Sequence, residues 1–139
     1  MKYVLDASIA LKWVLSEPDA AKARQLRDDF RNAVHELIAP DSFTVEIAHA
    51  LTKAQRRGMI PDAWALWADV MTTVPHLFPA HPMTPRAIQI ATQARIGVYD
   101  CLYVALAERE GCELVTADAR LLNSLQPTYP FLIALASVP

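Results

Sequence analysis

The sequence predicts a small α/β sandwich, in which a parallel sheet is covered by helices on both faces. Short apolar runs alternate along the chain with longer segments of helical periodicity. Strands that alternate with helices favour parallel pairing, because a helix returns the chain to the start of the next strand. The chain has 139 residues and no repeat or linker that would divide it. We therefore expect residues 1–139 to form a single domain.

The first half of the chain is expected to contain two strands and four helices. Tyr3-Val4-Leu5 is a short apolar strand, and a second strand ends at Pro40, because proline donates no N–H to a sheet. A break at residues 16–19 separates the first two helices, and Gly58 closes the third. The second strand is expected at residues 37–39, and the helices at about 8–15, 19–32, 41 or 42 to 57, and 61–74.

The second half is expected to contain three helices and two strands. Thr84-Pro85 begins a helix that extends to about residue 95. Asp100 begins the next helix, which Gly111 closes, and a short helix follows Asp118. The strands are expected at residues 114–116 and 131–135. The helices account for most of the chain.

Composition excludes several classes of function. Thirteen Lys and Arg against fifteen Asp and Glu give a net charge of −2, so nucleic acid could be bound only through local basic patches or a metal ion. With three glycines, the chain has neither a G-x-G-x-x-G motif nor a Walker loop for nucleotides. The apolar share of 53% indicates either a dense core or surface that meets another protein chain.

Nothing in the sequence directs the chain to a membrane. The first residues form no apolar signal segment, and no uncharged apolar run approaches the ~18 residues that span a bilayer. Cys101 and Cys112 lack metal-type spacing, and free buried thiols are common in cytosolic proteins. We therefore expect a cytoplasmic protein.

Three aspartates stand at the edges of predicted elements. Asp6 and Asp118 follow predicted strands, and ligands of open parallel sheets gather beyond the carboxyl ends of strands. Asp100 stands at the front of a segment with seven uncharged residues after it. Each could instead be a simple helix cap, since aspartate accepts backbone N–H bonds at helix starts.

Glu46 lies close to the apolar face of its predicted helix. Its neighbour four residues later is Ala50, so it lacks the basic partner that an exposed helical glutamate commonly has. His49, three residues later, could compensate. Otherwise a carboxylate turned toward the core requires a partner from elsewhere in the chain.

A cluster of these four acids would favour a metal ion. At ~6 Å and an effective dielectric near 20, each pair of carboxylates repels by about 2.8 kcal/mol. Either the pKa values rise or a divalent cation binds among the oxygens. Oxygen ligands suit Mg²⁺ or Mn²⁺, which can activate water and neutralise a phosphodiester. The acids therefore indicate phosphate chemistry.

Four segments also occur in a recognisable order. They are Val4-Leu5-Asp6-Ala7-Ser8, Glu46 followed by Ala50-Leu51-Thr52-Lys53, Tyr99-Asp100-Cys101-Leu102-Tyr103-Val104-Ala105-Leu106-Ala107, and Leu114-Val115-Thr116-Ala117-Asp118. From Met1 to about Leu122 the chain resembles the PIN-domain ribonucleases, and most of all the VapC-type toxins of toxin–antitoxin pairs. The resemblance implies a PIN-like α/β/α sandwich with a short-stranded, mainly parallel central sheet.

The resemblance also implies a site and its partners. It makes Asp6, Glu46, Asp100 and Asp118 a metal-binding cluster for Mg²⁺ or Mn²⁺, and places the Thr116 hydroxyl among the catalytic groups. Ser8 would line the same site. The implied activity is endonucleolytic cleavage of RNA, tRNA being one candidate. The implied partners are a second copy of the chain and an antitoxin that masks the cleft.

Other residues are secondary candidates. Lys12, Lys53, Arg56 and Arg57 could hold RNA phosphates or simply form solvated helix faces. The helix with Trp64 and Trp67 has few polar positions, so these rings could belong to the core or to a contact with an antitoxin or a second copy. The four histidines, His35, His49, His76 and His81, show no motif that pairs them with a nucleophile.

Two other classes of function compete with this interpretation. One is another Mg²⁺-binding acidic α/β protein, such as a receiver domain or a phosphohydrolase. The middle strand ends in Ile38-Ala39-Pro40 without a phospho-accepting aspartate, and Ser8 interrupts an Asp-x-Asp pattern, so both fit poorly. The other is a binding module that keeps the PIN shape without turnover, against which the presence of all four acids argues.

Overall fold

A computed structural model describes all residues, 1–139, as a five-stranded sheet between two layers of helices. The strands are β1 (Lys2–Leu5), β2 (Glu36–Pro40), β3 (His76–Phe78), β4 (Glu113–Thr116) and β5 (Leu132–Ala134). The α-helices are α1 (Ala7–Val14), α2 (Ala20–Arg31), α3 (Phe43–Arg56), α4 (Ala63–Met71), α5 (Thr84–Ala94), α6 (Val98–Glu110) and α7 (Ala119–Leu125). Two 3₁₀ turns, η1 (His81–Met83) and η2 (Leu135–Ser137), complete the chain.

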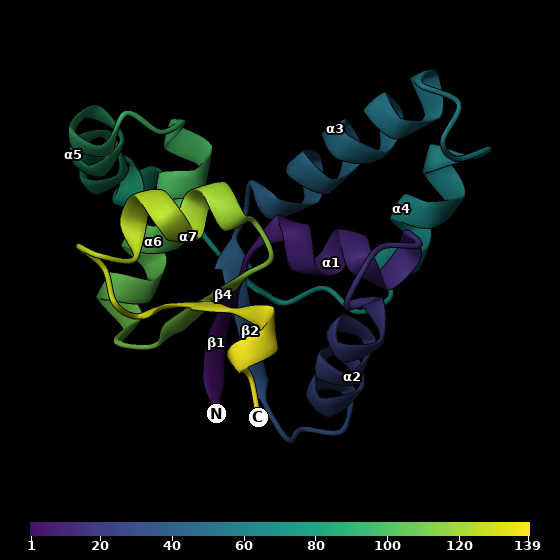
Figure 1. The fold of residues 1–139 in the computed structure, drawn as a ribbon, viewed down its shortest axis with the longest axis horizontal. Helices are drawn as coiled ribbons and strands as arrows, with labels where there is room; N and C mark the ends of the chain where they lie inside the picture. The colour runs from purple at the N-terminus through teal and green to yellow at the C-terminus, as the bar shows by residue number, and fades with distance from the viewer.

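The sheet is parallel throughout and has the order β3-β2-β1-β4-β5. Helices α1 to α4 lie on one side of it, and α5, α6 and α7 on the other (Figure 1). The chain winds outward from β1 in both directions, so β1 and β4 are the strands between which the winding reverses. Ligand sites of open α/β sheets lie beyond the carboxyl ends of such strands. The predicted α/β sandwich is confirmed.

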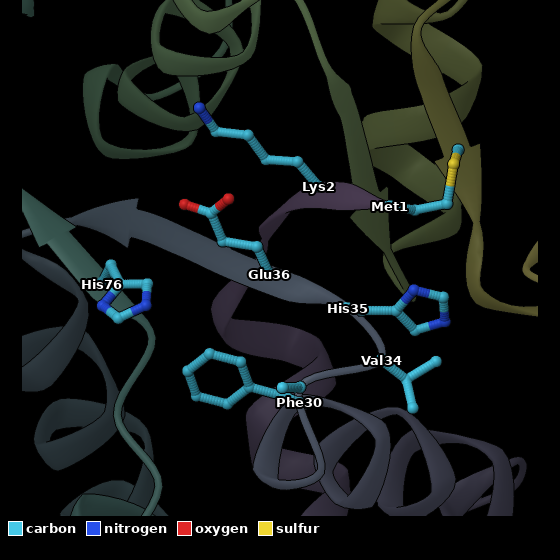
Figure 2. A pocket seen from close by; sticks show the side chains of 8 residues that line it. Met1, Lys2, Phe30, Val34, His35, Glu36 and His76 are labelled. Atoms are coloured by element: carbon cyan, nitrogen blue, oxygen red, sulfur yellow. The ribbon is translucent and has the colours of Figure 1, made fainter.

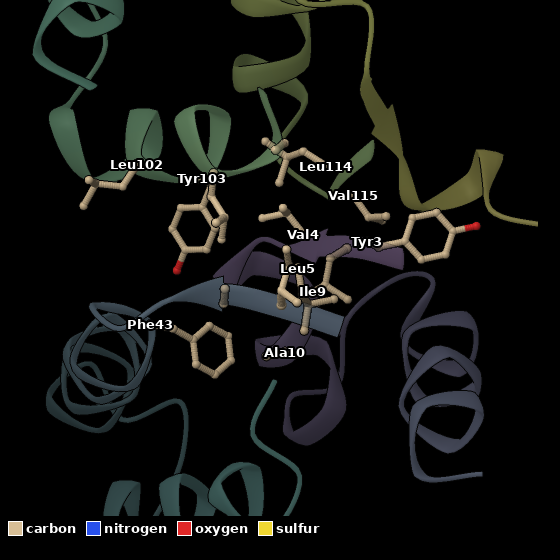
Figure 3. Close-up of a cluster of buried hydrophobic side chains, with 14 of the residues drawn as sticks. Tyr3, Val4, Leu5, Ile9, Ala10, Phe43, Leu102, Tyr103, Leu114 and Val115 are labelled. Atoms are coloured by element: carbon tan, nitrogen blue, oxygen red, sulfur yellow. The ribbon is translucent and has the colours of Figure 1, made fainter. Parts of the chain in front are cut away.

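The core consists of branched apolar side chains from the central strands and the helices on both faces. Val4 and Leu5 of β1 are fully buried and contact α6 on one side and α1 on the other (Figure 3). Helix α6 is the most enclosed helix, because seven consecutive residues, Cys101–Ala107, are buried. Burial on nearly all sides explains why its sequence lacks an amphipathic pattern. No helix combines the length and apolar character that crossing a membrane requires.

One strand was not predicted, and two predicted helix boundaries are displaced. The sequence predicted no strand at His76–Phe78, which forms the edge strand β3 and is mostly exposed. The predicted helix start at Asp100 is displaced, because α6 begins at Val98 with Gly97 as its N-cap. The fourth helix ends at Met71, three residues before the predicted end. The remaining helices and strands agree with prediction to within a few residues.

Candidate active site

Asp6 lies at the carboxyl end of β1 and is almost completely buried. It occupies the N-cap position of α1, yet its side chain makes no capping hydrogen bond. Instead its Oδ2 accepts hydrogen bonds from Ser8 Oγ at 2.5 Å and from Thr116 Oγ1 at 2.9 Å. A role as a plain helix cap therefore does not account for the hydroxyl partners of Asp6.

The two hydroxyls on Asp6 also fix the end of β4. Ser8 Oγ accepts a hydrogen bond from the backbone N–H of Ala117 at 3.0 Å, and Thr116 Oγ1 accepts one from the N–H of Asp118 at 3.0 Å. Thr116 is fully buried. This network joins the ends of β1 and β4, whose pairing places Leu5 beside Val115.

Asp118 is a helix cap as well as a candidate site residue. Its Oδ1 accepts hydrogen bonds from the backbone N–H groups of Arg120 at 2.9 Å and Leu121 at 3.3 Å, at the start of α7. The capping alternative is thus correct for this residue. A cap that uses Oδ1 leaves Oδ2 for another ligand.

Asp100 lies in the first turn of α6, on the opposite side of the sheet from α1. Its nearest cation is Arg120, whose Nη2 is 3.9 Å from Asp100 Oδ2 and whose side chain is 77% exposed. Burial raises the pKa of Asp100 to about 6, and the negative charges of Asp6 and Asp118 act in the same direction. Arg120 opposes this rise only in part.

Glu46 enters the site from α3, and its partners come from two elements. Its Oε2 accepts hydrogen bonds from Ser42 Oγ at 2.9 Å and from the Tyr103 hydroxyl at 2.8 Å. Burial raises the pKa of Glu46 to about 7, the two hydrogen bonds lower it, and the charges of Asp6 and Asp100 raise it. The expectation that Glu46 needs a partner from elsewhere is confirmed, and the partner is not His49.

The four acids form one electrostatic cluster. Desolvation raises the pKa of Asp6, and the charge of Asp118 raises it further. Together with Asp100 and Glu46, three carboxyl groups thus resist ionisation, and each is influenced by others of the four. Negative charge is therefore in excess, and only the exposed Arg120 offsets it.

The donor chemistry of this cluster fits a hard divalent cation. Every donor is a carboxylate or hydroxyl oxygen, and the hydroxyls bind one oxygen each of Asp6 and Glu46. The side chains are not drawn together as tightly as in a closed metal site, since no three His, Cys, Asp or Glu groups are arranged to hold one ion. A cation at this site would therefore be held by one or two of the carboxylates, with water completing its coordination.

The predicted basic residues are not part of the cluster. Lys12 Nζ donates a hydrogen bond to the carbonyl of Pro18 at 2.8 Å, and so serves the loop after α1. Lys53, Arg56 and Arg57 are exposed at the far end of α3 from Glu46. Lys53 is seven residues from Glu46, which is about 10 Å along a helix.

The two tryptophans of α4 differ in their surroundings. Trp67 is half-buried, and its Nε1 donates a hydrogen bond to the carbonyl of Thr44 at 2.9 Å. Trp64 is 71% exposed and stacks on Trp67 with the ring centroids 5.7 Å apart. Both border an apolar hollow of about 310 Å³ between α3 and α4. Trp67 therefore packs against the hydrophobic core beside α3, whereas Trp64 does not belong to the core.

A cavity of about 410 Å³ lies at the opposite end of the sheet from the acids. It is bordered by the amino ends of β1 and β2, with Lys2, Phe30, His35, Glu36 and His76 among its lining residues (Figure 2). None of the four acids contributes to it. The cluster of four acids and this cavity are therefore separate features of the structure.

The fold and the site together define an α/β protein with an acidic centre, supported by hydroxyl groups, at the carboxyl ends of the central strands β1 and β4, between which the winding of the chain reverses. The family model described as "PIN domain" matches residues 3–124. The chain therefore belongs to the PIN-domain family, and its relatives place it in the VapC-type group. The resemblance stated from the motifs is confirmed.

Several curated relatives cover most of the chain. Ribonuclease VapC12 of Mycobacterium tuberculosis is 39% identical over 124 residues, which are 87% of this chain and 90% of that protein. Ribonuclease VapC9 of the same organism is 33% identical over 135 residues, 94% and 96% of the two chains. Ribonuclease VapC3 of Pyrobaculum aerophilum is 32% identical over 128 residues, 87% and 92%.

Solved structures share the fold. The crystal structure of PAE2754 from Pyrobaculum aerophilum superimposes with a TM-score of 0.71 at 22% identity, and covers 99% of this chain and 94% of that one. The structure of VapBC2 from Rickettsia felis, bound to a DNA fragment from its promoter, gives a TM-score of 0.62 at 16% identity, covering 96% and 97%. At these identities the likeness concerns the fold alone.

Proposed function

We propose that this protein is an endoribonuclease that hydrolyses RNA phosphodiester bonds with the help of Mg²⁺ or Mn²⁺. The observation that carries the proposal is the cluster of Asp6, Glu46, Asp100 and Asp118, in which three carboxyl groups have raised pKa values. The relatives named ribonucleases support the same activity.

We propose a metal ion because the four carboxyl groups of the cluster have only one nearby cation, the exposed Arg120. Asp6, Glu46, Asp100 and Asp118 would hold it through oxygens that the hydroxyls and the α7 cap leave free. A bound Mg²⁺ or Mn²⁺ would supply an activated water and neutralise charge on the phosphate. Ionised carboxylates bind the cation more strongly, so metal binding and deprotonation favour each other.

The chain's own residues have distinct parts in this proposal. Thr116 Oγ1 donates to Asp6 and accepts from Asp118 N–H, so Thr116 orients ligands and does not itself attack RNA. Ser8 shares this task. Arg120, exposed beside Asp100, is placed to meet an RNA phosphate at the edge of the cluster. Local cations of this kind are needed because the net charge is −2.

The biological role that we propose is that of a type II toxin, held inactive by a cognate antitoxin in the cytoplasm where its RNA substrate is found. The relatives named VapC ribonucleases, among them VapC12 at 39% identity, support this role. The exposed Trp64 on α4 supplies apolar surface for an antitoxin or for a homodimer contact. In this role residues 1–139 would act as a single domain.

The experiment that tests the proposal is RNA cleavage by the purified protein with EDTA, with Mg²⁺ restored, and with Asp6→Asn. We expect cleavage only in the unmodified protein with metal. Undiminished cleavage in EDTA, with carried-over metal excluded, would contradict the metal requirement. Hydrolysis of phosphate monoesters in place of RNA would favour a phosphohydrolase, and RNA binding without cleavage would favour a non-catalytic binding module.

A further inference from the structure

Glu46 is held at one of its two carboxylate oxygens by two hydroxyl groups. Ser42 Oγ and the Tyr103 hydroxyl donate to Oε2 at 2.9 Å and 2.8 Å. Neither bond involves Oε1. A carboxylate fixed through one oxygen has its plane and direction set, while the other oxygen stays available to a ligand.

The Tyr103 side chain lies in the hydrophobic core. Its exposure is 0%, and its ring projects from α6 toward the start of α3 among Leu5, Leu102 and Phe43 (Figure 3). Burial and the nearby carboxylates raise the pKa of Tyr103 well above its ordinary value. The hydroxyl therefore remains protonated and acts as a donor to Glu46.

The same helix carries another member of the cluster. Asp100 and Tyr103 are three residues apart on α6 and so share one face of it. Helix α6 thus contributes Asp100 directly, and fixes Glu46 of α3 through Tyr103. The arrangement parallels that at Asp6, where Ser8 and Thr116 donate to Oδ2 alone.

We infer that Tyr103, together with Ser42, is a positioning residue that holds Glu46 by Oε2 and leaves Oε1 as the oxygen for the divalent cation. The inference rests on the proposed function and names two residues that act through Glu46. Groups that orient a metal ligand commonly change metal affinity by about tenfold or more when they are removed. Neither residue touches RNA in this role.

The test is Mn²⁺ affinity, measured by electron paramagnetic resonance on the protein without RNA, in Tyr103→Phe and Ser42→Ala. We expect Tyr103→Phe to bind Mn²⁺ about tenfold more weakly, and Ser42→Thr, which keeps a hydroxyl, to bind more tightly than Ser42→Ala. Tyr3→Phe is the control for loss of a tyrosine hydroxyl, because the Tyr3 side chain also lies in the core and its hydroxyl makes no hydrogen bond to the acids. Its Mn²⁺ affinity should remain within twofold of the unmodified protein.

A second measurement separates positioning from ionisation and from folding. We expect the weaker Mn²⁺ binding of Tyr103→Phe to persist at pH 8 as well as pH 7, and cleavage to return at saturating Mn²⁺. Equal Mn²⁺ affinity in Tyr103→Phe and the unmodified protein would overturn the inference, as would a difference that disappears at pH 8. A melting temperature that falls more in Tyr103→Phe than in Tyr3→Phe, with Mn²⁺ affinity unchanged, would show a structural role only.

The outcome also separates this inference from the proposed function. If the unmodified protein binds Mn²⁺ and Tyr103→Phe binds it less, but neither cleaves RNA, the nuclease proposal fails and the positioning role stands. If both bind Mn²⁺ equally and the unmodified protein cleaves RNA, the positioning role alone fails. If the unmodified protein binds no Mn²⁺, both are wrong.

Discussion

Asp100→Asn should stabilise the metal-free protein while it abolishes RNA cleavage. The substitution replaces a half-buried carboxyl with an amide of nearly the same shape. In the metal-free protein, burial and the charges of Asp6 and Asp118 raise the pKa of Asp100 to about 6. Ionised Asp100 therefore opposes folding at neutral pH, and the neutral amide removes this opposition.

The magnitude follows from the difference between the two pKa values. The unfolded value is near 3.8 and the folded value about 6, so the folded state binds more protons between them. The free energy of unfolding therefore falls as pH rises through this window and stays lower above it. The full difference corresponds to about 3 kcal/mol, and solvent screening of a side chain that is 31% exposed reduces it to about 1–2 kcal/mol.

The assay is thermal unfolding in EDTA, followed by circular dichroism. For a chain of this size, about 1–2 kcal/mol corresponds to a rise of about 3–8 °C in melting temperature at pH 7.5. The advantage of Asp100→Asn should disappear near pH 4, where the carboxyl of the unmodified protein is neutral as well. Cleavage of RNA in Mg²⁺ should be lost at pH 7.5.

A different result would refute this reasoning. If Asp100 served only the positive amino end of α6, removal of its charge would lower stability by up to about 1 kcal/mol and leave RNA cleavage intact. A lower melting temperature in EDTA at pH 7.5, combined with normal cleavage, would therefore show that Asp100 stabilises a helix and belongs to no catalytic centre.

Three further predictions concern the same cluster and its surroundings. In EDTA the melting temperature of the unmodified protein should fall between pH 5 and pH 8, because folded Glu46 has a pKa of about 7 and folded Asp100 one of about 6. Mn²⁺ should reverse this fall at pH 8. A melting temperature that does not change with pH would contradict the raised pKa values. Arg120→Ala should raise the pKa of Asp100 further and move the acid side of the cleavage pH profile to higher pH, whereas an unchanged profile would mean that the exposed guanidinium is screened from the carboxylate. Binding of an antitoxin should weaken Mg²⁺ binding if a basic side chain of the partner occupies the cluster; equal Mg²⁺ affinity of complex and free protein, measured by calorimetry, would show that inhibition acts by blocking RNA entry.

Residues in the central strands were predictable, because burial on both faces leaves a clear sequence signal. Val4-Leu5 and Leu114-Val115 are uninterrupted apolar pairs, and the acids after them mark the carboxyl edge of the sheet. Strand β3 was not predictable in the same way. It has three residues, begins with His76, and lies at an exposed edge, so neither apolar alternation nor a buried run distinguishes it from a loop.

The partners of the acids were harder to predict than the acids themselves. A sequence pattern shows that Glu46 lacks a local cation, but Tyr103 is 57 positions away in the chain. Helices α3 and α6 lie on opposite sides of the sheet, so only the folded chain brings the two side chains within hydrogen-bond distance. Ser42 could have been found, because it stands four residues before Glu46, at the N-cap of the same helix. The role of the four acids as metal ligands stays a prediction.

The hydrogen bonds that join Ser8, Thr116 and Asp6 can form only late in protein synthesis. Thr116 and Asp118 leave the ribosome more than one hundred residues after Asp6, and Thr116 is what closes the network on Asp6 Oδ2. A growing chain that ends before β4 has no complete acid cluster, however well its first half has folded. The proposed nuclease centre can therefore be complete only when most of the chain has been translated, because Asp118, the last of its four acids, follows Asp6 by more than one hundred residues.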